Sequence, residues 1–276
     1  MTTSPHSTLH LTVHAGIAEI VLDNPPVNVI SAVMMRELTE TLSGLRDDPA
    51  VRVIVFSSAN PEYFLAHVDM RIAEDLDILQ GLAVAALAHT NVFQAIGELL
   101  RRQPQVTIVK LAGKTRGGGA EFVAAADMAF AARETAGIGQ IESLMGIVPS
   151  GGGTQYLLER VGRNRALEAV LTGDLFDADT AATYGWINRA VPAADLDAFV
   201  DNVARKIAAL PDGVIEKTKS LLPPADLTAG YLREEAAWSE LIARPAAQQL
   251  MSAALRQGAQ TPEGEADLES LMRSLR

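Results

Sequence analysis

The sequence predicts a mixed α/β fold with a helical C-terminal region. Short alternating apolar segments, typical of strands, lie between longer segments with helical apolar spacing over the first two-thirds of the chain. From about Asp177 onward the pattern is helical almost throughout, with interruptions at Pro192, Pro211, Pro223 and Pro224. With 276 residues, 48% of them apolar, the chain is long enough to bury a sizeable core.

The predicted elements follow one another along the chain. Up to residue 111 they are a hairpin over 9–22 that turns at 14–16, a helix over 31–45, a strand over 51–57, one long amphipathic helix over about 81–101 and a strand over 106–111. They continue with a helix after the glycines at 117–119, a strand around 128–131, and a helix that follows the glycines at 151–153 and that Thr154 is predicted to cap. Strands and helices therefore alternate, as in an α/β fold.

Composition excludes several classes of function. The net charge of −11 argues against a nucleic-acid partner, because that binding depends on clustered Lys and Arg. No cysteine is present, so disulfides and thiolate chemistry are excluded. The chain has no apolar run of about 18 residues, and its polar start lacks a signal-peptide layout, so we expect a cytoplasmic protein without a membrane partner. The five histidines show no metal-ligand spacing, and we expect no catalytic metal.

Two glutamates and a glycine cluster form the candidate site. The glycines at 117–119 leave backbone N–H groups accessible to an anionic oxygen at a helix start. Glu121 follows in the first helical turn, and Glu142 follows a predicted strand and loop. Burial near such a site raises a carboxyl pKa into the range that suits a general acid or base. Close packing of glycines and a helix-dipole interaction of Glu121 are the structural alternatives.

The order of these motifs resembles the crotonase family, also called the enoyl-CoA hydratase/isomerase family. The motifs that support the resemblance are residues 24–28, 64–69, 117–122, 139–142 and 146–154. The resemblance extends from about Leu9 to the C-terminus and implies a crotonase-like spiral of ββα repeats over residues 1–200. It further implies a C-terminal helical region, 201–276, that mediates assembly into a homotrimer or a hexamer.

The resemblance also implies roles for individual residues. Val68 and Gly118 occupy the positions whose backbone N–H groups form an oxyanion hole for a thioester oxygen. Glu121 and Glu142 occupy the positions of the two catalytic glutamates of the hydratases. The residues expected to contact the acyl-coenzyme A substrate are Val27, Ala66, His67, Asp69, Arg116 and Gly117.

Two of these residues depart from the usual family pattern. His67 stands where a glycine is usual, so it is either a turn residue facing solvent or adenine, or a functional group beside the thioester. Arg116 replaces an apolar residue and either forms an ion pair with Asp69 or a neighbouring subunit, or recognises a carboxylate on the acyl group.

Together these features predict an enzyme that adds water to a trans-2-enoyl-CoA through an oxyanion-stabilised enolate. Preorganised N–H donors stabilise the developing charge, and two carboxyls move the protons. Isomerase, decarboxylase or C–C hydrolase chemistry are enzymatic alternatives, and a non-catalytic acyl-CoA-binding protein is the alternative from another class. We expect no cofactor other than the coenzyme A of the substrate.

Overall fold

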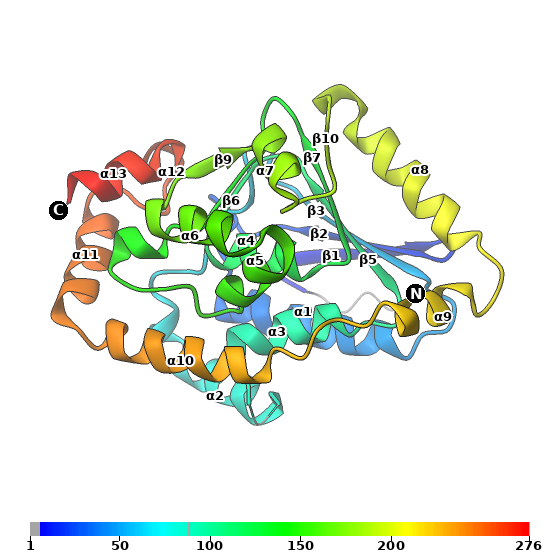
Figure 1. Ribbon diagram of the computed structural model, residues 1–276, viewed down its shortest axis with the longest axis horizontal. Coiled ribbons are helices and arrows are strands. Elements are labelled where there is room, and N and C mark those ends of the chain that lie inside the picture. The colour runs from blue at the N-terminus through cyan, green and yellow to red at the C-terminus, as the bar shows by residue number, and fades with distance from the viewer. Residues whose placement is uncertain (1–5, 88, 276) are drawn as a thin grey trace.

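Two β-sheets form the frame of the protein in the computed structural model, which describes residues 6–87 and 89–275 (Figure 1). The strands of the first sheet are, in spatial order, β1 (Leu9–His14), β2 (Ile17–Leu22), β3 (Val53–Ser58), β5 (Val106–Leu111), β7 (Met128–Ala132) and β10 (Arg189–Val191). Those of the second sheet are β4 (Tyr63–Leu65), β6 (Lys114–Arg116), β8 (Gly137–Gly139) and β9 (Leu175–Asp177). The pairs β1–β2 and β8–β9 are antiparallel, and the other pairs are parallel.

The chain alternates between the two sheets as it advances. The strands β3, β5 and β7 of the first sheet are each followed by a strand of the second sheet, β4, β6 and β8, and then by one or two helices. This repetition confirms the predicted spiral of ββα units. Parallel strands need a helical crossover to return to the same edge, which explains why a helix closes each turn of the spiral.

Thirteen α-helices cover the sheets and extend the C-terminal part within the described residues (Figure 1). The first seven are α1 (Ala32–Arg46), α2 (Leu76–Ala85), α3 (Val92–Arg101), α4 (Gly118–Ala125), α5 (Gly153–Val161), α6 (Arg163–Thr172) and α7 (Ala178–Tyr184). The others are α8 (Leu196–Ala208), α9 (Val214–Leu221), α10 (Thr228–Ile242), α11 (Pro245–Arg256), α12 (Pro262–Ala266) and α13 (Leu268–Ser274). None of the described helices is long and apolar enough to cross a membrane.

The C-terminal helices reach back to the spiral. Helix α8 runs through the predicted division at residue 200 and packs on β2, β3, β5 and β7. Helix α10 contacts α5, and α11 and α13 contact the 3₁₀ turn Glu142–Met145 (Figure 1). The predicted role of residues 201–276 in oligomerisation stays a prediction.

The single helix predicted over residues 81–101 is wrong. The structure has two helices, α2 and α3, separated by an extended residue at Ala86. Asn91 is the N-cap residue of α3, and its side chain accepts hydrogen bonds from the N–H groups of Phe93 and Gln94. This cap starts a new helix at Val92. The Gln94 side chain in turn accepts from the Asn91 N–H, which completes a capping box. A local cap has therefore overridden the apolar periodicity.

Asn28 joins three segments of the first ββα turn. It is buried, its φ of 59° is left-handed, and its Nδ2 donates to the carbonyl oxygens of Leu22 and Phe64 and to Ser58 Oγ at 3.1, 2.9 and 2.7 Å. Asparagine tolerates this backbone region better than most residues, and its amide satisfies acceptors that water cannot reach. Asn28 thereby fixes the chain next to the loop that leads to Val68.

We expect Asn28→Ala to lower the free energy of unfolding by about 3 kcal/mol, because it leaves buried acceptors unsatisfied and places alanine at positive φ. Urea denaturation followed by circular dichroism measures the change. Asn202→Ala, at an exposed position of α8, is the matched control and should leave the midpoint nearly unchanged. Equal midpoints for the two variants would contradict this interpretation of Asn28.

Candidate active site

A cavity of about 300 Å³ brings most of the predicted site residues together. It is lined by His67, Val68, Asp69, Gly117, Gly118, Glu121 and Glu142. Apolar side chains form most of the remaining wall, among them Leu76, Phe93, Ile141, Met145, Trp238 and Ile242. Cavities of this size with a few converging polar groups are typical of small-molecule sites.

The glycines next to the cavity make room for the two carboxylates. A Cβ atom at Gly117 would lie 2.8 Å from Glu142 Oε1, and one at Gly151 would lie 2.3 Å from Glu121 Oε2. Gly117 also has a positive φ of 51°, which a larger residue adopts only with strain. The absence of side chains at these positions is therefore what allows Glu121 and Glu142 to approach the backbone so closely.

Glu121 is held by the turn that begins α5. Its Oε1 accepts hydrogen bonds from the N–H groups of Gly151 and Gly153 at 2.8 and 2.9 Å. A Cβ at Gly118 would lie 3.7 Å from Oε2, so the second oxygen lies between Gly151 and Gly118. One carboxylate oxygen is therefore fixed by backbone donors, while the other lies close to the glycines of two segments.

The helix cap predicted at Thr154 is wrong. Gly152 is the N-cap residue of α5, and Thr154 lies inside the helix. The carboxylate of Glu234, from α10, accepts from the N–H groups of Gly152 and Thr154 at 2.7 and 3.0 Å. A carboxylate that arrives from far along the chain thus satisfies the free N–H groups of this helix start.

Glu142 begins the 3₁₀ turn that follows β8. The side-chain amide of Gln140 faces its carboxylate, and with the amide nitrogen turned toward Glu142 it donates to Oε2 and Oε1 at 3.0 and 3.2 Å. Gln140 is fully buried, so its donor has no access to water in place of Glu142. This side chain orients the second carboxylate as Gly151 and Gly153 orient the first.

Both acids are harder to ionise than free glutamate. Burial raises the pKa of Glu121 well above its usual value, the charges of Glu142 and Glu234 raise it further, and the N–H groups of Gly153 and Gly151 oppose the increase. Burial also raises the pKa of Glu142 to about 7, against the effect of its own backbone N–H. One proton shared between these neighbours near neutral pH suits general acid–base chemistry.

The backbone amides of Val68 and Gly118 are free of protein acceptors in the described part of the chain. The carbonyl of His67 accepts from Ile30 N–H at 2.8 Å, and the carbonyl of Gly117 accepts from Glu121 N–H at 2.9 Å. A trans peptide points its N–H away from its C=O, so the Val68 and Gly118 N–H groups point away from these partners. The geometry leaves both donors available at the cavity wall.

His67 does not face solvent, so the prediction of a solvent-facing turn residue is wrong. It is 2% exposed, and its Nε2 lies 2.9 Å from Glu265 Oε1. The positive φ values among described non-glycine residues occur at Ala15, Asn28 and Gln260, so His67 fits its backbone without the strain of a replaced glycine.

Arg116 is ion-paired, but not to Asp69. Its guanidinium is 0% exposed and donates to Glu269 at 2.6 and 3.0 Å, with Glu265 at 3.5 Å. It lies outside the lining of the cavity, as do Val27 and Ala66, which are buried together against Val29 and Tyr63. Their predicted substrate contacts are therefore not direct side-chain contacts with this cavity.

The sequence alone did not reveal the partners that come from the C-terminal helices. Glu234 and Trp238 on α10, Glu265 on α12 and Glu269 on α13 are such partners, and the three glutamates lie 80 residues or more beyond the site groups that they contact. The only available signal is that glutamates interrupt the apolar faces of these helices, and many exposed helices show the same pattern. Their roles follow from tertiary contacts.

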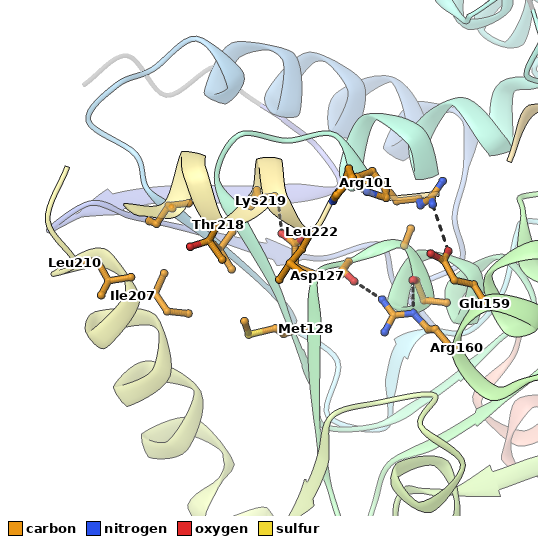
Figure 2. A pocket seen from close by; sticks show the side chains of 17 residues that line it. Arg101, Asp127, Met128, Glu159, Arg160, Ile207, Leu210, Thr218, Lys219 and Leu222 are labelled. Carbon is orange, nitrogen blue, oxygen red and sulfur yellow. Dashed lines mark hydrogen bonds and ion pairs between the residues drawn. The ribbon is translucent and has the colours of Figure 1, made fainter. Parts of the chain in front are cut away.

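A second cavity, of about 480 Å³, lies away from the predicted residues, between α8, α9 and the ends of β5 and α4 (Figure 2). Its charged groups have structural partners. Lys219 pairs with Asp127 at 2.6 Å, and Arg101 pairs with Glu159 at 3.3 Å. Arg160 donates to the carbonyl oxygens of residues 124 and 126 at the end of α4. These groups join helices to the sheet and contain no pair of acids like that of the first cavity.

Comparison with known proteins agrees with the cavity chemistry. Residues 12–235 match the family model described as enoyl-CoA hydratase/isomerase. A carnitinyl-CoA dehydratase of Proteus mirabilis is 33% identical over 200 residues, which cover 72% of this chain and 74% of the relative. The chain belongs to the enoyl-CoA hydratase/isomerase family, which is also called the crotonase family.

Two further relatives support this assignment. A Mycobacterium bovis protein named as a candidate enoyl-CoA hydratase is 33% identical over 178 residues, 64% of this chain and 66% of its own length. The crystal structure of a candidate enoyl-CoA hydratase from Streptomyces avermitilis is 70% identical, with a TM-score of 0.97 over 98% of both chains. The fold and the family are therefore those predicted from the motifs.

We expect infrared difference spectra of the unliganded protein to show a protonated carboxyl band that persists to neutral pH. In Glu142→Gln the pKa of Glu121 should fall, because the charge of Glu142 no longer raises it. It should stay above the usual value for glutamate, because burial is unchanged. The control Glu62→Gln changes an exposed carboxylate and should leave the band unaltered. If the wild-type band is already lost when the pH is raised to 5, the proposed burial of both acids is contradicted.

Proposed function

We propose that this protein hydrates a trans-2-enoyl-CoA thioester by means of Glu121 and Glu142. The observation that supports this most is their convergence with the Val68 and Gly118 residues on one mainly apolar cavity. Two unoccupied N–H donors suit the oxygen of an enolate, and two carboxyls of raised pKa suit the transfer of two protons.

The chemistry assigns a step to each group. Water attacks Cβ of the enoyl group, a carboxylate takes one of its protons, and the electron pair of the double bond moves into the thioester as an enolate. The N–H groups stabilise the negative oxygen, and the second, protonated carboxyl then gives its proton to Cα. Addition needs one ionised and one neutral acid, and the raised pKa values favour that mixed state near neutral pH.

The cavity favours an uncharged acyl chain. Its described lining includes no Lys or Arg, and Arg116, the candidate for a substrate carboxylate, is occupied by Glu265 and Glu269. Leu76, Phe93 and Trp238 instead offer apolar contacts. Burial of a carboxylate in such a wall without a partner is unfavourable.

Three earlier expectations accompany this proposal. The coenzyme A thioester is the only cofactor-like group required, the assembly is a homotrimer or a hexamer, and the location is the cytoplasm. Each remains a prediction. Metal analysis can test the first, size-exclusion chromatography the second and cell fractionation the third.

Wild-type protein should remove the absorbance of the conjugated enoyl thioester of crotonyl-CoA. Glu121→Gln and Glu142→Gln should each lower kcat by about 10²–10⁴-fold, because each removes a proton-transfer group of similar size and shape. A panel of longer and carboxylated enoyl-CoAs, measured in the same assay, should show a preference for uncharged chains.

Glu62→Gln again serves as the control and should retain wild-type kcat. If the wild type binds the whole panel tightly and turns over none of it, the hydratase proposal fails and the non-catalytic alternative holds. Double-bond migration without hydration would instead identify an isomerase.

The plot of kcat/KM against pH should be bell-shaped. At low pH both acids are protonated and no base is present, so kcat/KM should rise with pH through about 7, the pKa of Glu142. At higher pH the raised pKa of Glu121 is passed, both acids are ionised, and the rate should fall again. A flat kcat/KM between pH 5 and 9 would be inconsistent with this pair as the acid and base.

A further inference from the structure

A buried ionic cluster lies directly behind the two predicted oxyanion donors. It consists of His67, Arg116, Glu265 and Glu269, all of them buried. His67 immediately precedes Val68, and Arg116 precedes Gly117 and Gly118. Each of the two backbone segments that present a donor therefore contains one cation of the cluster.

Glu265 connects these two cations. Its Oε1 lies 2.9 Å from His67 Nε2, and its Oε2 lies 3.5 Å from an Arg116 nitrogen. The main-chain oxygen of Glu265 also accepts from Arg116 at 3.3 Å. The two segments touch each other directly as well, since Arg116 N–H donates to the carbonyl of Ala66 at 3.0 Å.

The segment that carries Glu265 is itself anchored to the loop after β4. Gln260 Oε1 accepts from Met70 N–H at 2.7 Å, and Gln260 Nε2 donates to Asp69 Oδ1 at 3.0 Å. The Gln260 N–H donates to Glu265 Oε1 at 2.9 Å. The carboxylate of Glu265 is thus fixed relative to the residues on both sides of Val68.

His67 carries a positive charge in this arrangement. Its Nδ1 lies 2.7 Å from the Val68 carbonyl and its Nε2 faces a carboxylate, so both nitrogens face acceptors and both must donate. Burial lowers the pKa of His67, but Glu265 outweighs burial and the net shift is upward. The pKa of Glu265 is correspondingly lowered, although burial alone raises it.

The cluster therefore contains two cations and two anions, and its net charge is zero. A neutral cluster adds little long-range field to the negative oxygen of an enolate. Its effect on the reaction comes instead from geometry, because charge-assisted hydrogen bonds are short and directional and hold their partners in place.

We propose that Glu265 is a positioning residue that sets the separation of the Val68 and Gly118 N–H groups by holding His67 on one side and Arg116 on the other. The inference rests on the proposed function, since it assigns those N–H groups to a thioester oxygen. It makes α12, a five-residue helix near the C-terminus, part of the active-site architecture.

The test measures carbonyl polarisation without turnover. Butyryl-CoA labelled with ¹³C at the thioester carbonyl lacks the double bond, and its C=O stretch should shift to lower frequency when it binds the wild-type protein. Glu265→Gln keeps the size of the side chain but removes the charge, and it should lose at least half of that shift. Its kcat with crotonyl-CoA should fall by about 10–100-fold, because a donor displaced by about 1 Å loses much of its effect. Its KM should change by less than about threefold.

Glu98→Gln is the matched control, because Glu98 is also buried and paired with an arginine, Arg101, but lies away from the cavity. It should lower thermal stability and leave both the carbonyl shift and kcat unchanged. If Glu265→Gln is not folded, Glu265→Asp retains the charge, withdraws it by one methylene and should lose part of the shift.

The outcomes separate the two proposals. A wild-type complex without any carbonyl shift refutes the oxyanion hole, and with it the role of Glu265. A full wild-type shift that either folded Glu265 variant retains, together with unchanged kcat, refutes the role of Glu265 alone. A shift that decreases in the Glu265 variant and not in Glu98→Gln supports the positioning role.

Discussion

The burial of two acids in one cavity is the constraint on which the rest of the site depends. Glu121 and Glu142 can be placed there only because Gly117 and Gly151 leave space, since a Cβ at either position would overlap a carboxylate oxygen. Burial raises both pKa values, and fixed donors limit that increase: the Gly153 and Gly151 N–H groups for Glu121, and its own backbone N–H for Glu142. Raised pKa values favour a pair with one neutral and one ionised acid, which is the state that the proposed hydration needs.

The C-terminal helices are part of the site and not an appendage to it. Helix α10 supplies Glu234 to the helix start that holds Glu121, and it supplies Trp238 to the cavity wall. Helices α12 and α13 supply the carboxylates that neutralise His67 and Arg116. An unpaired buried cation is strongly destabilising, so the two departures from the family pattern require these partners.

The sequence motifs predicted the residues of the site better than the apolar periodicity predicted the helix boundaries. The glycine runs and the two glutamates were recognisable because each restricts local backbone geometry, and the structure brings them to one cavity. The helix predicted over 81–101 was wrong because Asn91 and Gln94 form a cap that apolar spacing does not reveal. Thr154 was assigned as a cap because it is the usual residue type, whereas Glu234 arrives from α10 and takes that role.

The sequence by itself determined the family, the spiral order of strands and helices, and the identity of the paired acids, because these depend on residue types at fixed short separations. Only the tertiary structure decided what surrounds them. It placed His67 against Glu265 instead of solvent, paired Arg116 with Glu269 instead of Asp69, and left a mainly apolar cavity wall without Lys or Arg. These pairings depend on which distant carboxylate lies next to which buried cation. The energy of each ion pair depends on burial and distance, which no local sequence pattern encodes.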